Sequence, residues 1–167
     1  MPIVFRGRVF NVEVADIRFP DGRRRTVEIV RHPPSIVLLP MDDDGRVILI
    51  RQFRATIERE IWELPAGSVN ANESAEAAAA RECEEEIALV PTRIERLRGF
   101  YPAPGFCDEE LIFFRVSGLT PPPPDSPHKP DEDEDIHARA FSIADAKALV
   151  ARVGIIDLKT AYGLTLL

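Results

Sequence analysis

Two almost uninterrupted apolar runs do most to constrain the fold of this chain. They are SIVLLP at 35–40 and RVILIRQFR at 46–54, with the turn-forming sequence MDDDG between them. Short apolar runs bounded by turn residues are typical of buried strands. The chain also has helical patterns at about 73–89, 143–154 and 157–167 that can cover a sheet. The sequence therefore predicts an α/β fold in which a mixed sheet has helices on its faces.

The first 34 residues follow a different pattern. RVFNVEVADIRF and TVEIVRH alternate between apolar and polar residues, and the turn-forming PDGRRR lies between them. Such alternation predicts strands, but a β-segment this small cannot bury much apolar surface alone. We expect a small N-terminal antiparallel β-segment over 1–34 and a main domain over 35–167. Further strands are predicted at EIWELPAG, RIERLRGFY, EELIFFRVSGL and IHARAFS.

Charge and composition argue against several classes of protein. The formal net charge is -7, whereas proteins that bind nucleic acid or anionic membrane surfaces carry basic patches. The apolar runs are far shorter than the roughly 20 residues that span a bilayer. Cys83 and Cys107 are too few for a disulfide framework. We expect a reduced, cytoplasmic protein with no nucleic acid and no membrane among its partners.

Four glutamates occupy six positions in RECEEE at 81–86. This segment lies in a predicted helix that starts after a cap at Asn70 or Asn72 and runs to about Leu89. Helical spacing puts three carboxylates on one side: Glu82, Glu85 and Glu86. Like charges at such spacing repel, so the segment is either a solvated face or a place where a cation binds. Mg²⁺ prefers oxygen ligands from carboxylates and substrate phosphates, so a pocket here would suit magnesium and a phosphate.

Other residues of the same helix bear on such a site. Arg81 lies four residues before Glu85 and can pair with it. Small side chains lie toward the carboxylate side and are expected to leave room for a ligand: Ala75, Ala78 and Ala79. An apolar stripe lies on another side: Ala80, Cys83 and Ile87.

The spacing of these residues resembles the Nudix box of the Nudix hydrolases. The box positions matched are Gly67, Glu73, Arg81, Glu82, Glu85 and Glu86. Two positions depart from it, because Cys83 replaces the usual aliphatic residue and Ala88 replaces the second glycine, which is expected to alter the helix exit. The resemblance implies an α/β/α sandwich that hydrolyses a nucleoside diphosphate linked to another group, with Mg²⁺ or Mn²⁺ as cofactor.

Motifs outside the box extend the resemblance to the ADP-ribose pyrophosphatase branch. They are VEIVRHP, IRQFR, WELPAG, YPAPGFCDE and PDEDEDI, so roughly the whole chain is covered. This branch implies hydrolysis of ADP-ribose to AMP and ribose 5-phosphate by a homodimer whose N-terminal β-segments are exchanged between subunits. Sugar-nucleotide hydrolases such as GDP-mannose pyrophosphatases share most of these outer motifs.

The resemblance also implies roles for individual residues. The expected catalytic residues are Glu132, as general base, and Glu85. The expected metal ligands are the backbone carbonyl of Ala66 and the side chains of Glu82, Glu85, Glu86 and Glu134. Glu132 and Glu134 can exchange roles, because they are neighbouring acids of one segment. The expected substrate contacts are Arg54, Ser68, Pro104, Glu109, Arg51 and, across the dimer, Glu28 and Arg31. An ordinary surface role is an alternative for each substrate contact, and Arg51 is expected to point away from Arg54.

Other interpretations stay open at this stage. The substrate can be another nucleotide sugar, such as GDP-mannose, or an oxidised nucleotide. A Nudix-fold sensor that binds a nucleotide without cleaving it is a third interpretation, although all box acids are retained. Trp62 is interpreted as a core residue, and the scattered histidines argue against a histidine metal site. Candidates to stack on the base are Phe5, Phe10, Phe19 and Phe100.

Overall fold

The computed structural model of the chain describes residues 2–128, 136–152 and 157–167. The strands are β1 (Ile3–Arg6), β2 (Asn11–Arg18), β3 (Arg24–Arg31), β4 (Ser35–Pro40), β5 (Val47–Arg54), β6 (Arg59–Glu63), β7 (Ala66–Ser68), β8 (Val90–Phe100), β9 (Leu111–Thr120) and β10 (His137–Phe141). The helices are α1 (Ala75–Ile87), α2 (Ile143–Ala151), α3 (Leu158–Gly163) and the short 3-10 helix η1 (Leu164–Leu166). Within the described ranges no helix is long and apolar enough to cross a membrane.

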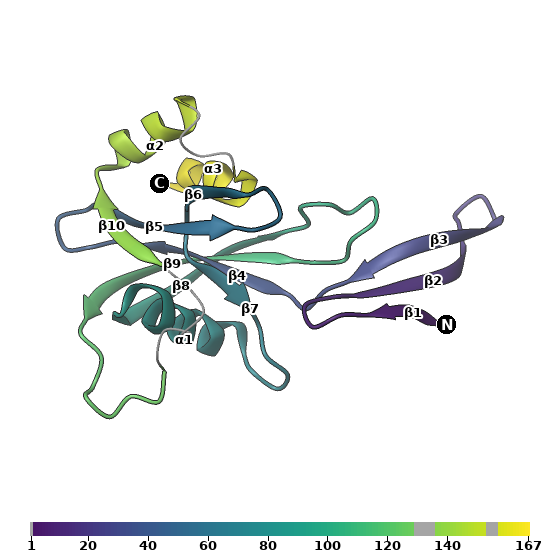
Figure 1. Cartoon of the computed structure of the whole chain (residues 1–167), viewed down its shortest axis with the longest axis horizontal. Helices are drawn as coiled ribbons and strands as arrows, with labels where there is room; N and C mark the ends of the chain where they lie inside the picture. The colour runs from purple at the N-terminus through teal and green to yellow at the C-terminus, as the bar shows by residue number, and fades with distance from the viewer. Residues whose placement is uncertain (1, 129–135, 153–156) are drawn as a thin grey trace.

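Two sheets form the body of the molecule. One is mixed, with strand order β7-β4-β9-β8, and its β4 and β9 are parallel. The other is antiparallel, with strand order β10-β5-β6. Helix α1 lies on one side of these sheets, and α2 and α3 lie on the other (Figure 1). The predicted mixed sheet with helices on its faces is confirmed.

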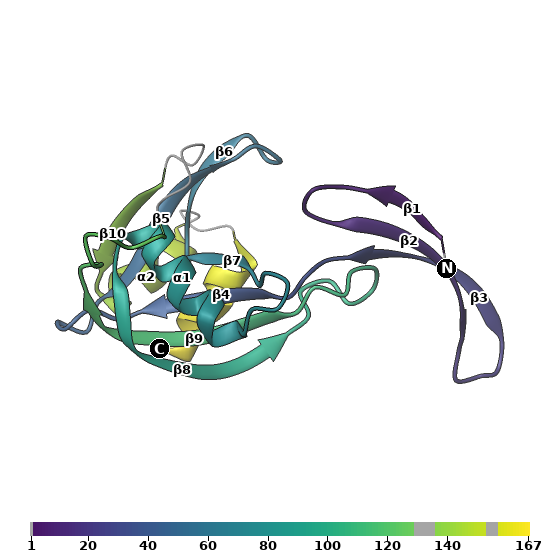
Figure 2. The ribbon, with the colours of Figure 1, turned by 90° about the horizontal axis from the view of Figure 1, so that it is seen from below.

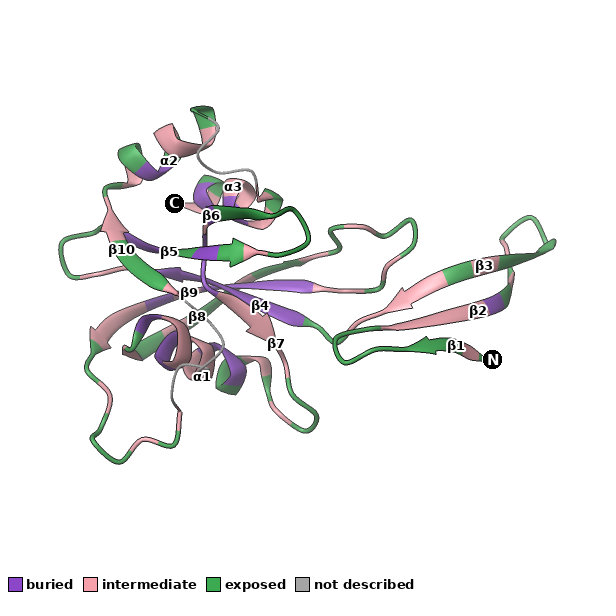
Figure 3. Ribbon diagram, viewed as in Figure 1, coloured by how far each residue is buried: buried purple, intermediate pink, exposed green. Residues whose placement is uncertain are grey.

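The two apolar runs form the centre of this body, as predicted. Every residue of β4 is buried, and β5 is buried through its first half (Figure 3). Because side chains alternate along a strand, β4 contributes to two cores. Ile36 and Leu38 face α1, while Val37 and Leu39 belong to the cluster on the other side. A strand buried on both faces needs apolar residues at every position, which is what the sequence provides.

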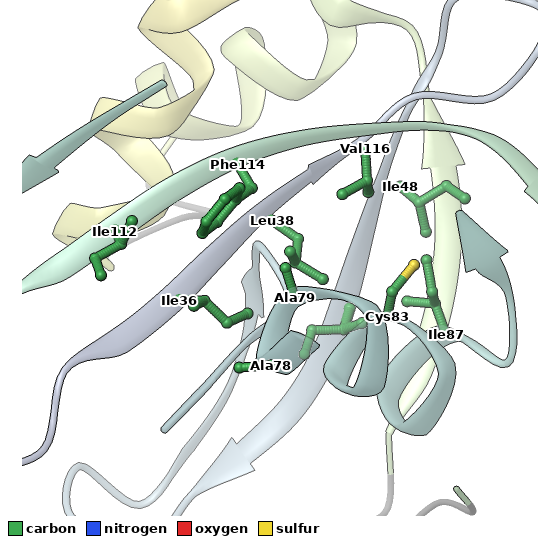
Figure 4. Packing of buried hydrophobic residues seen from close by; sticks show 11 residues of the cluster. Ile36, Leu38, Ile48, Ala78, Ala79, Cys83, Ile87, Ile112, Phe114 and Val116 are labelled. Atoms are coloured by element: carbon green, nitrogen blue, oxygen red, sulfur yellow. The ribbon is translucent and has the colours of Figure 1, made fainter. Parts of the chain in front are cut away.

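Helix α1 packs on this core through small residues. Ala78 and Ala79 are fully buried against Ile36 and other residues of the cluster, and Cys83 and Ile87 continue the contact (Figure 4). The expectation that these alanines leave room for a ligand is therefore wrong. Their small side chains instead allow the helix axis to approach the sheet closely, while the carboxylates stay at the edge of the contact. Cys83 is a conservative replacement because its site is buried and apolar.

The ends of α1 differ from the sequence prediction. Ser74 is the N-cap, and its hydroxyl accepts a hydrogen bond from the backbone of Ala77. Asn70 instead belongs to a tight turn before the helix, where its N–H donates to the Glu73 carboxylate at 2.9 Å. At the other end Ala88 adopts a left-handed conformation with φ 55°, and its N–H donates to Glu84 O. A glycine is the usual residue at such a cap, because a β-carbon is unfavourable there.

Replacement of Ala88 by glycine is expected to stabilise the protein. The left-handed conformation costs an alanine roughly 1–2 kcal/mol, part of which glycine loses again to the flexibility of the unfolded chain, so we expect a gain of about 1 kcal/mol. Thermal unfolding should show a melting temperature about 2–4 °C higher. Ala80→Gly, inside the same helix, is the control and should destabilise the protein by about 1 kcal/mol. An unchanged or lower melting temperature for Ala88→Gly would contradict this account of the cap.

Strands β1–β3 form a separate antiparallel sheet that projects from the body (Figure 2). Its base is attached where Val30 N–H donates to Phe106 O and Val30 O accepts from Asp108 N–H. Ala15 is the one apolar residue of its described strands that is buried. Large apolar side chains of this sheet and its connecting turn are exposed instead: Val4, Phe5, Val9 and Phe10. The projecting sheet, residues 2–31, is called the arm below.

Candidate active site

The candidate site lies where β7 meets helix α1. β7 pairs with the first half of β4, so that Ser68, Gly67 and Ala66 lie beside Ser35, Ile36 and Val37. Helix α1 contacts both of these strands. The acids of α1 are therefore presented to the backbone of β7. A short connection leads from β7 into α1 (Figure 1).

Arg81 is the centre of the hydrogen-bond network at this site. Its Nε and Nη2 donate to the two carboxylate oxygens of Glu73 at 2.9 and 3.0 Å. Its Nη1 donates to Glu82 at 2.6 Å and to Glu85 at 2.7 Å, and Nη2 also reaches Ser68 O at 3.0 Å. The expected pair with Glu85 is thus one of several. Arg81 lies largely buried among these acceptors, and the hydrogen bonds that it donates to Glu73, followed by those to Glu82, raise its pKa. This single cation holds three carboxylates together.

Gly67 leaves the space that Glu82 occupies. A β-carbon at Gly67 would lie 1.9 Å from Oε1 of Glu82, far inside any van der Waals contact. The glycine of the box therefore leaves room for this close approach, in which the carboxylate of Glu82 lies directly on the backbone of β7.

Glu86 is a further box carboxylate that contacts β7, one helical turn after Glu82. Its Oε2 accepts a hydrogen bond from Ala66 N–H at 2.8 Å. In the described part of the chain no three His, Cys, Asp or Glu side chains already converge as a ready set of metal ligands. The carboxylates are held by Arg81 and by the β7 backbone instead. A cradle of hard oxygen donors against a bare glycine fits a divalent ion such as Mg²⁺, which would exchange those partners for metal bonds.

Replacement of Gly67 by alanine is expected to reduce divalent-metal binding by about 10- to 100-fold, the range typical when a ligand loses its support. The reason is that the new methyl group must displace the Glu82 carboxylate. Titration calorimetry with Mg²⁺ or Mn²⁺ measures the change. Gly105→Ala is the matched control, because a β-carbon there meets nothing within 4 Å. Equal metal affinity in both variants would contradict the assignment of Glu82 to a metal site.

A second network links β5 and β6 to the C-terminal helix. Arg54 donates to Glu63 through Nε at 2.6 Å and Nη2 at 2.9 Å, a bidentate pair. Lys159 donates to the same Glu63 carboxylate and, at 2.8 Å, to Asp157. The hydroxyl of Thr160 donates to Asp157, and it accepts a hydrogen bond from Leu64 N–H at 2.8 Å. Glu63 lies within the WELPAG motif, but no motif indicated its pairing with Lys159, because the two residues are 96 positions apart in the chain.

Arg54 and Arg51 lie on opposite faces of β5, as strand alternation predicts. Arg51 is exposed and pairs with Glu60 of the neighbouring strand. Arg54 is nearer the box, since its pKa is raised first by the hydrogen bonds that it donates to Glu63 and further by the charge of Glu86. Of the two arginines, Arg54 is therefore the one that the fold places beside the box acids.

Two of the other expected substrate contacts, Arg31 and Glu109, lie near the base of the arm. Arg31 donates to Asp108 at 2.7 Å and also pairs with Glu13. Glu109 accepts a hydrogen bond from the Ser35 hydroxyl at 2.8 Å, and Ser35 is the strand neighbour of Ser68. Glu109 is thus close to the box through β4. Two further expected contacts are exposed, one on β3 and one in the loop before β9: Glu28 and Pro104.

The two expected acids of the PDEDEDI segment, Glu132 and Glu134, lie outside the described residues. His128, the residue before this gap, has its Nδ1 3.8 Å from Oε1 of Glu85. The last described residue before this segment thus lies beside the box.

Of the four stacking candidates, one packs at the edge of the core and three lie on the arm. Phe100 packs edge-on against Phe113 and Tyr162, and Trp62 packs edge-on against Phe141. Trp62 belongs to the periphery of the core, as predicted. The remaining stacking candidates lie on the arm, where one contacts an arginine and two contact each other: Phe19, Phe5 and Phe10.

Comparison with known proteins extends these observations. A family model for the NUDIX domain matches residues 31–158. The chain is 35% identical over 161 residues to an ADP-ribose pyrophosphatase of Bacillus subtilis, covering 96% of this chain and 86% of that protein. It is 31% identical over 157 residues to the methanol dehydrogenase activator of Bacillus methanolicus, covering 94% and 84%. A solved structure of an ADP compounds hydrolase superposes with a TM-score of 0.82 at 25% identity, covering 99% of this chain and 88% of that one.

Proposed function

Because the chain belongs to the NUDIX domain family, we propose that it hydrolyses the pyrophosphate of ADP-ribose to AMP and ribose 5-phosphate in a magnesium-dependent reaction. One observation carries the proposal more than any other. The box acids are complete and are gathered on one side of α1 against Gly67. The similarity to an ADP-ribose pyrophosphatase over 96% of the chain supports this choice of substrate.

Several residues of the chain would hold the metal and the diphosphate. Glu82, Glu85 and Glu86, with the carbonyl of Ala66, would be the ligands of Mg²⁺. When bound, the ion neutralises the diphosphate and lowers the pKa of a coordinated water. Arg81 orients Glu82 and Glu85, because its Nη1 donates to both.

Proton transfer is assigned to the acidic segment that follows His128. In this proposal Glu132 accepts a proton from the attacking water, and Glu134 adds a further ligand. Arg54 contacts the phosphates, since a guanidinium can bind phosphate oxygens with paired hydrogen bonds. Ser68, Pro104 and Glu109 line the remaining part of the substrate cleft.

A substrate panel tests this function. Purified protein is given ADP-ribose, GDP-mannose and an oxidised nucleoside triphosphate, each with Mg²⁺, and products are identified by chromatography. The expected result is AMP and ribose 5-phosphate, with kcat/KM for ADP-ribose at least about tenfold above the others. Removal of divalent ions with a chelator should abolish turnover, and added Mg²⁺ should restore it. A higher kcat/KM for another compound would identify that compound as the substrate in place of ADP-ribose. Tight binding without product would indicate that the protein is a sensor.

We further propose that the arm makes the protein a homodimer and that the partner is a second copy of this chain. The arm cannot bury its own apolar residues, since Phe5 is 52% and Val9 56% exposed. Three small strands without a covering layer are marginal alone, so another surface is needed. Exchange of the arms would bring Glu28 and Arg31 toward the partner's substrate. The two free cysteines support a cytoplasmic location.

The double substitution Phe5→Ser and Phe10→Ser is expected to weaken dimerisation by about 100-fold, because buried aromatic anchors dominate interface energies. Sedimentation equilibrium measures the dissociation constant. Arg6→Ser, a change of an exposed polar residue on the same strand, should leave it within about threefold. If the wild-type protein sediments as a monomer at micromolar concentration, the dimer proposal fails while the hydrolase proposal stands.

A further inference from the structure

We propose that Glu63 is a positioning residue for hydrolysis: it fixes the guanidinium of Arg54 beside the box acids and is itself fixed by Lys159 of the C-terminal helix. The inference rests on the proposed function for the role of Arg54 as a phosphate contact. It assigns a role to Glu63, which is part of the WELPAG motif but has no role assigned above, and it adds Lys159 of α3.

The first step is the state of Glu63 itself. It is the last residue of β6 and only 2% of its side chain is exposed. Burial alone would raise its pKa, but the hydrogen bonds from Arg54 and the charge of Lys159 outweigh burial and hold the pKa below its ordinary value. Glu63 is therefore a buried carboxylate that stays ionised because two cations share it. Such an arrangement fixes side chains strongly, since each ion loses its partner if one of them moves.

The second step concerns the N–H donors of Arg54 that Glu63 does not use. Its Nε and one N–H of Nη2 are used by Glu63. A guanidinium has five N–H donors in a rigid plane, so the remaining donors point away from Glu63. The Arg54 side chain is 38% exposed and lines a cleft of about 430 Å³ together with Ile57, Glu63 and Lys159. Glu63 thus sets the direction in which Arg54 offers its free donors.

The third step connects this cleft to the box. Glu63 is followed by Leu64 and Pro65 and then by Ala66, whose N–H donates to Glu86. Leu64 N–H is bonded to the Thr160 hydroxyl, which lies next to Lys159 in the chain. Consecutive residues of α3 therefore hold the side chain of Glu63 and the backbone that follows it. Arg54 and the carbonyl of Ala66 are positioned by one connected unit.

A double-mutant cycle separates positioning from a merely structural role. Glu63→Gln keeps the shape of the side chain but removes the charge that the two cations share. We expect it to lower kcat/KM for ADP-ribose by about 10- to 100-fold in the wild-type background. In the Arg54→Met background the same substitution should lower kcat/KM by less than about twofold, because its effect passes through Arg54. Metal affinity, measured by calorimetry, should stay within about twofold throughout.

Two further variants complete the design. Lys159→Met removes the second cation while it leaves the Arg54–Glu63 pair in place, and it should lower kcat/KM by about threefold to tenfold, again only when Arg54 is present. If Glu63→Gln does not fold, as judged by thermal unfolding, Lys159→Met provides the test instead. Glu60→Gln is the matched control, since Glu60 pairs with Arg51 on the outer face of the same two strands. It should leave kcat/KM within about twofold.

The outcomes decide between the explanations. Losses that multiply in the double variant, or metal affinity that falls in step with kcat/KM, would overturn positioning through Arg54. Unchanged kcat/KM for both Glu63→Gln and Lys159→Met would do the same. If wild-type protein prefers another nucleotide, the substrate proposal fails and the cycle is run on that nucleotide. If nothing is cleaved, the cycle is measured as the dissociation constant for ADP-ribose, with the same expected pattern.

Discussion

Glu86→Gln is expected to lower kcat for ADP-ribose by about a thousandfold, which corresponds to about 4 kcal/mol of transition-state stabilisation. Glutamine has nearly the same shape but lacks the charge that binds a divalent ion. Glu86 accepts a hydrogen bond from Ala66 N–H, so it lies against the backbone that supplies the proposed carbonyl ligand. The measurement is steady-state hydrolysis at saturating Mg²⁺, combined with calorimetric titration of the metal.

Glu76→Gln is the control for this substitution. Glu76 lies in the first turn of the same helix, carries the same charge and is exposed. Its replacement should leave kcat within about twofold, because an exposed charge contributes little to a site that it does not touch. If Glu86→Gln retains wild-type turnover, or if both variants lose it equally, α1 does not carry the metal site.

Arg81→Met is expected to produce the largest loss of stability. The change leaves Glu73, Glu82 and Glu85 without their shared cation, and these side chains are only 16%, 12% and 27% exposed. Removal of one partner from a buried ion pair costs 3–5 kcal/mol, and we expect about 3 kcal/mol here because the acids are partly exposed. The melting temperature should fall by about 6–12 °C.

The pH dependence of this loss has a defined sign. The hydrogen bonds from Arg81 hold the pKa of Glu73 below its ordinary value of 4.5. A lowered pKa in the folded state stabilises the protein above the ordinary value, and this contribution disappears as the pH falls through the lowered pKa. The difference in melting temperature between wild type and Arg81→Met should therefore narrow below about pH 4.5. A difference that widens on acidification would contradict this role of the pair.

Arg46→Met provides the comparison for an exposed ion-pair group. Arg46 pairs with Asp42 and Asp44 in the hairpin between β4 and β5, and its side chain is 49% exposed. Its replacement should cost no more than about 1 kcal/mol. Equal destabilisation by Arg46→Met and Arg81→Met would mean that burial does not distinguish the two networks.

The sequence predicted the parts of the fold that depend on local pattern. The apolar runs of β4 and β5 have apolar residues on both faces. In the structure these residues are buried on both faces of the strands. The predicted start of α1 was wrong because three residues that make good N-caps lie within five positions: Asn70, Asn72 and Ser74. The choice of Ser74 depends on a turn in which Asn70 N–H bonds to Glu73, and such a turn has no clear signature.

The site was predictable only as far as one helix determines it. Spacing along α1 placed Glu82, Glu85 and Glu86 together and predicted the Arg81–Glu85 pair. The contact between Lys159 and Glu63 joins residues 96 positions apart in the chain. No periodicity encodes such a contact, because it depends on how α3 folds back onto β6. Arg54 was singled out, but the buried carboxylate that holds it was not.

The buried thiol of α1 has a consequence for experiments in solution. Burial, with the nearby charges of Glu84 and Glu86, raises the pKa of Cys83 to about 12, so a thiolate is almost absent at neutral pH. An alkylating reagent meets Cys107 first, since that side chain is partly accessible, and reaches Cys83 only while α1 has lifted from the sheet. The rate of the slow second alkylation therefore reports how often this helix separates from the sheet. A ligand bound to the acidic side of the helix is expected to lower that rate, which can be measured without any assay of turnover.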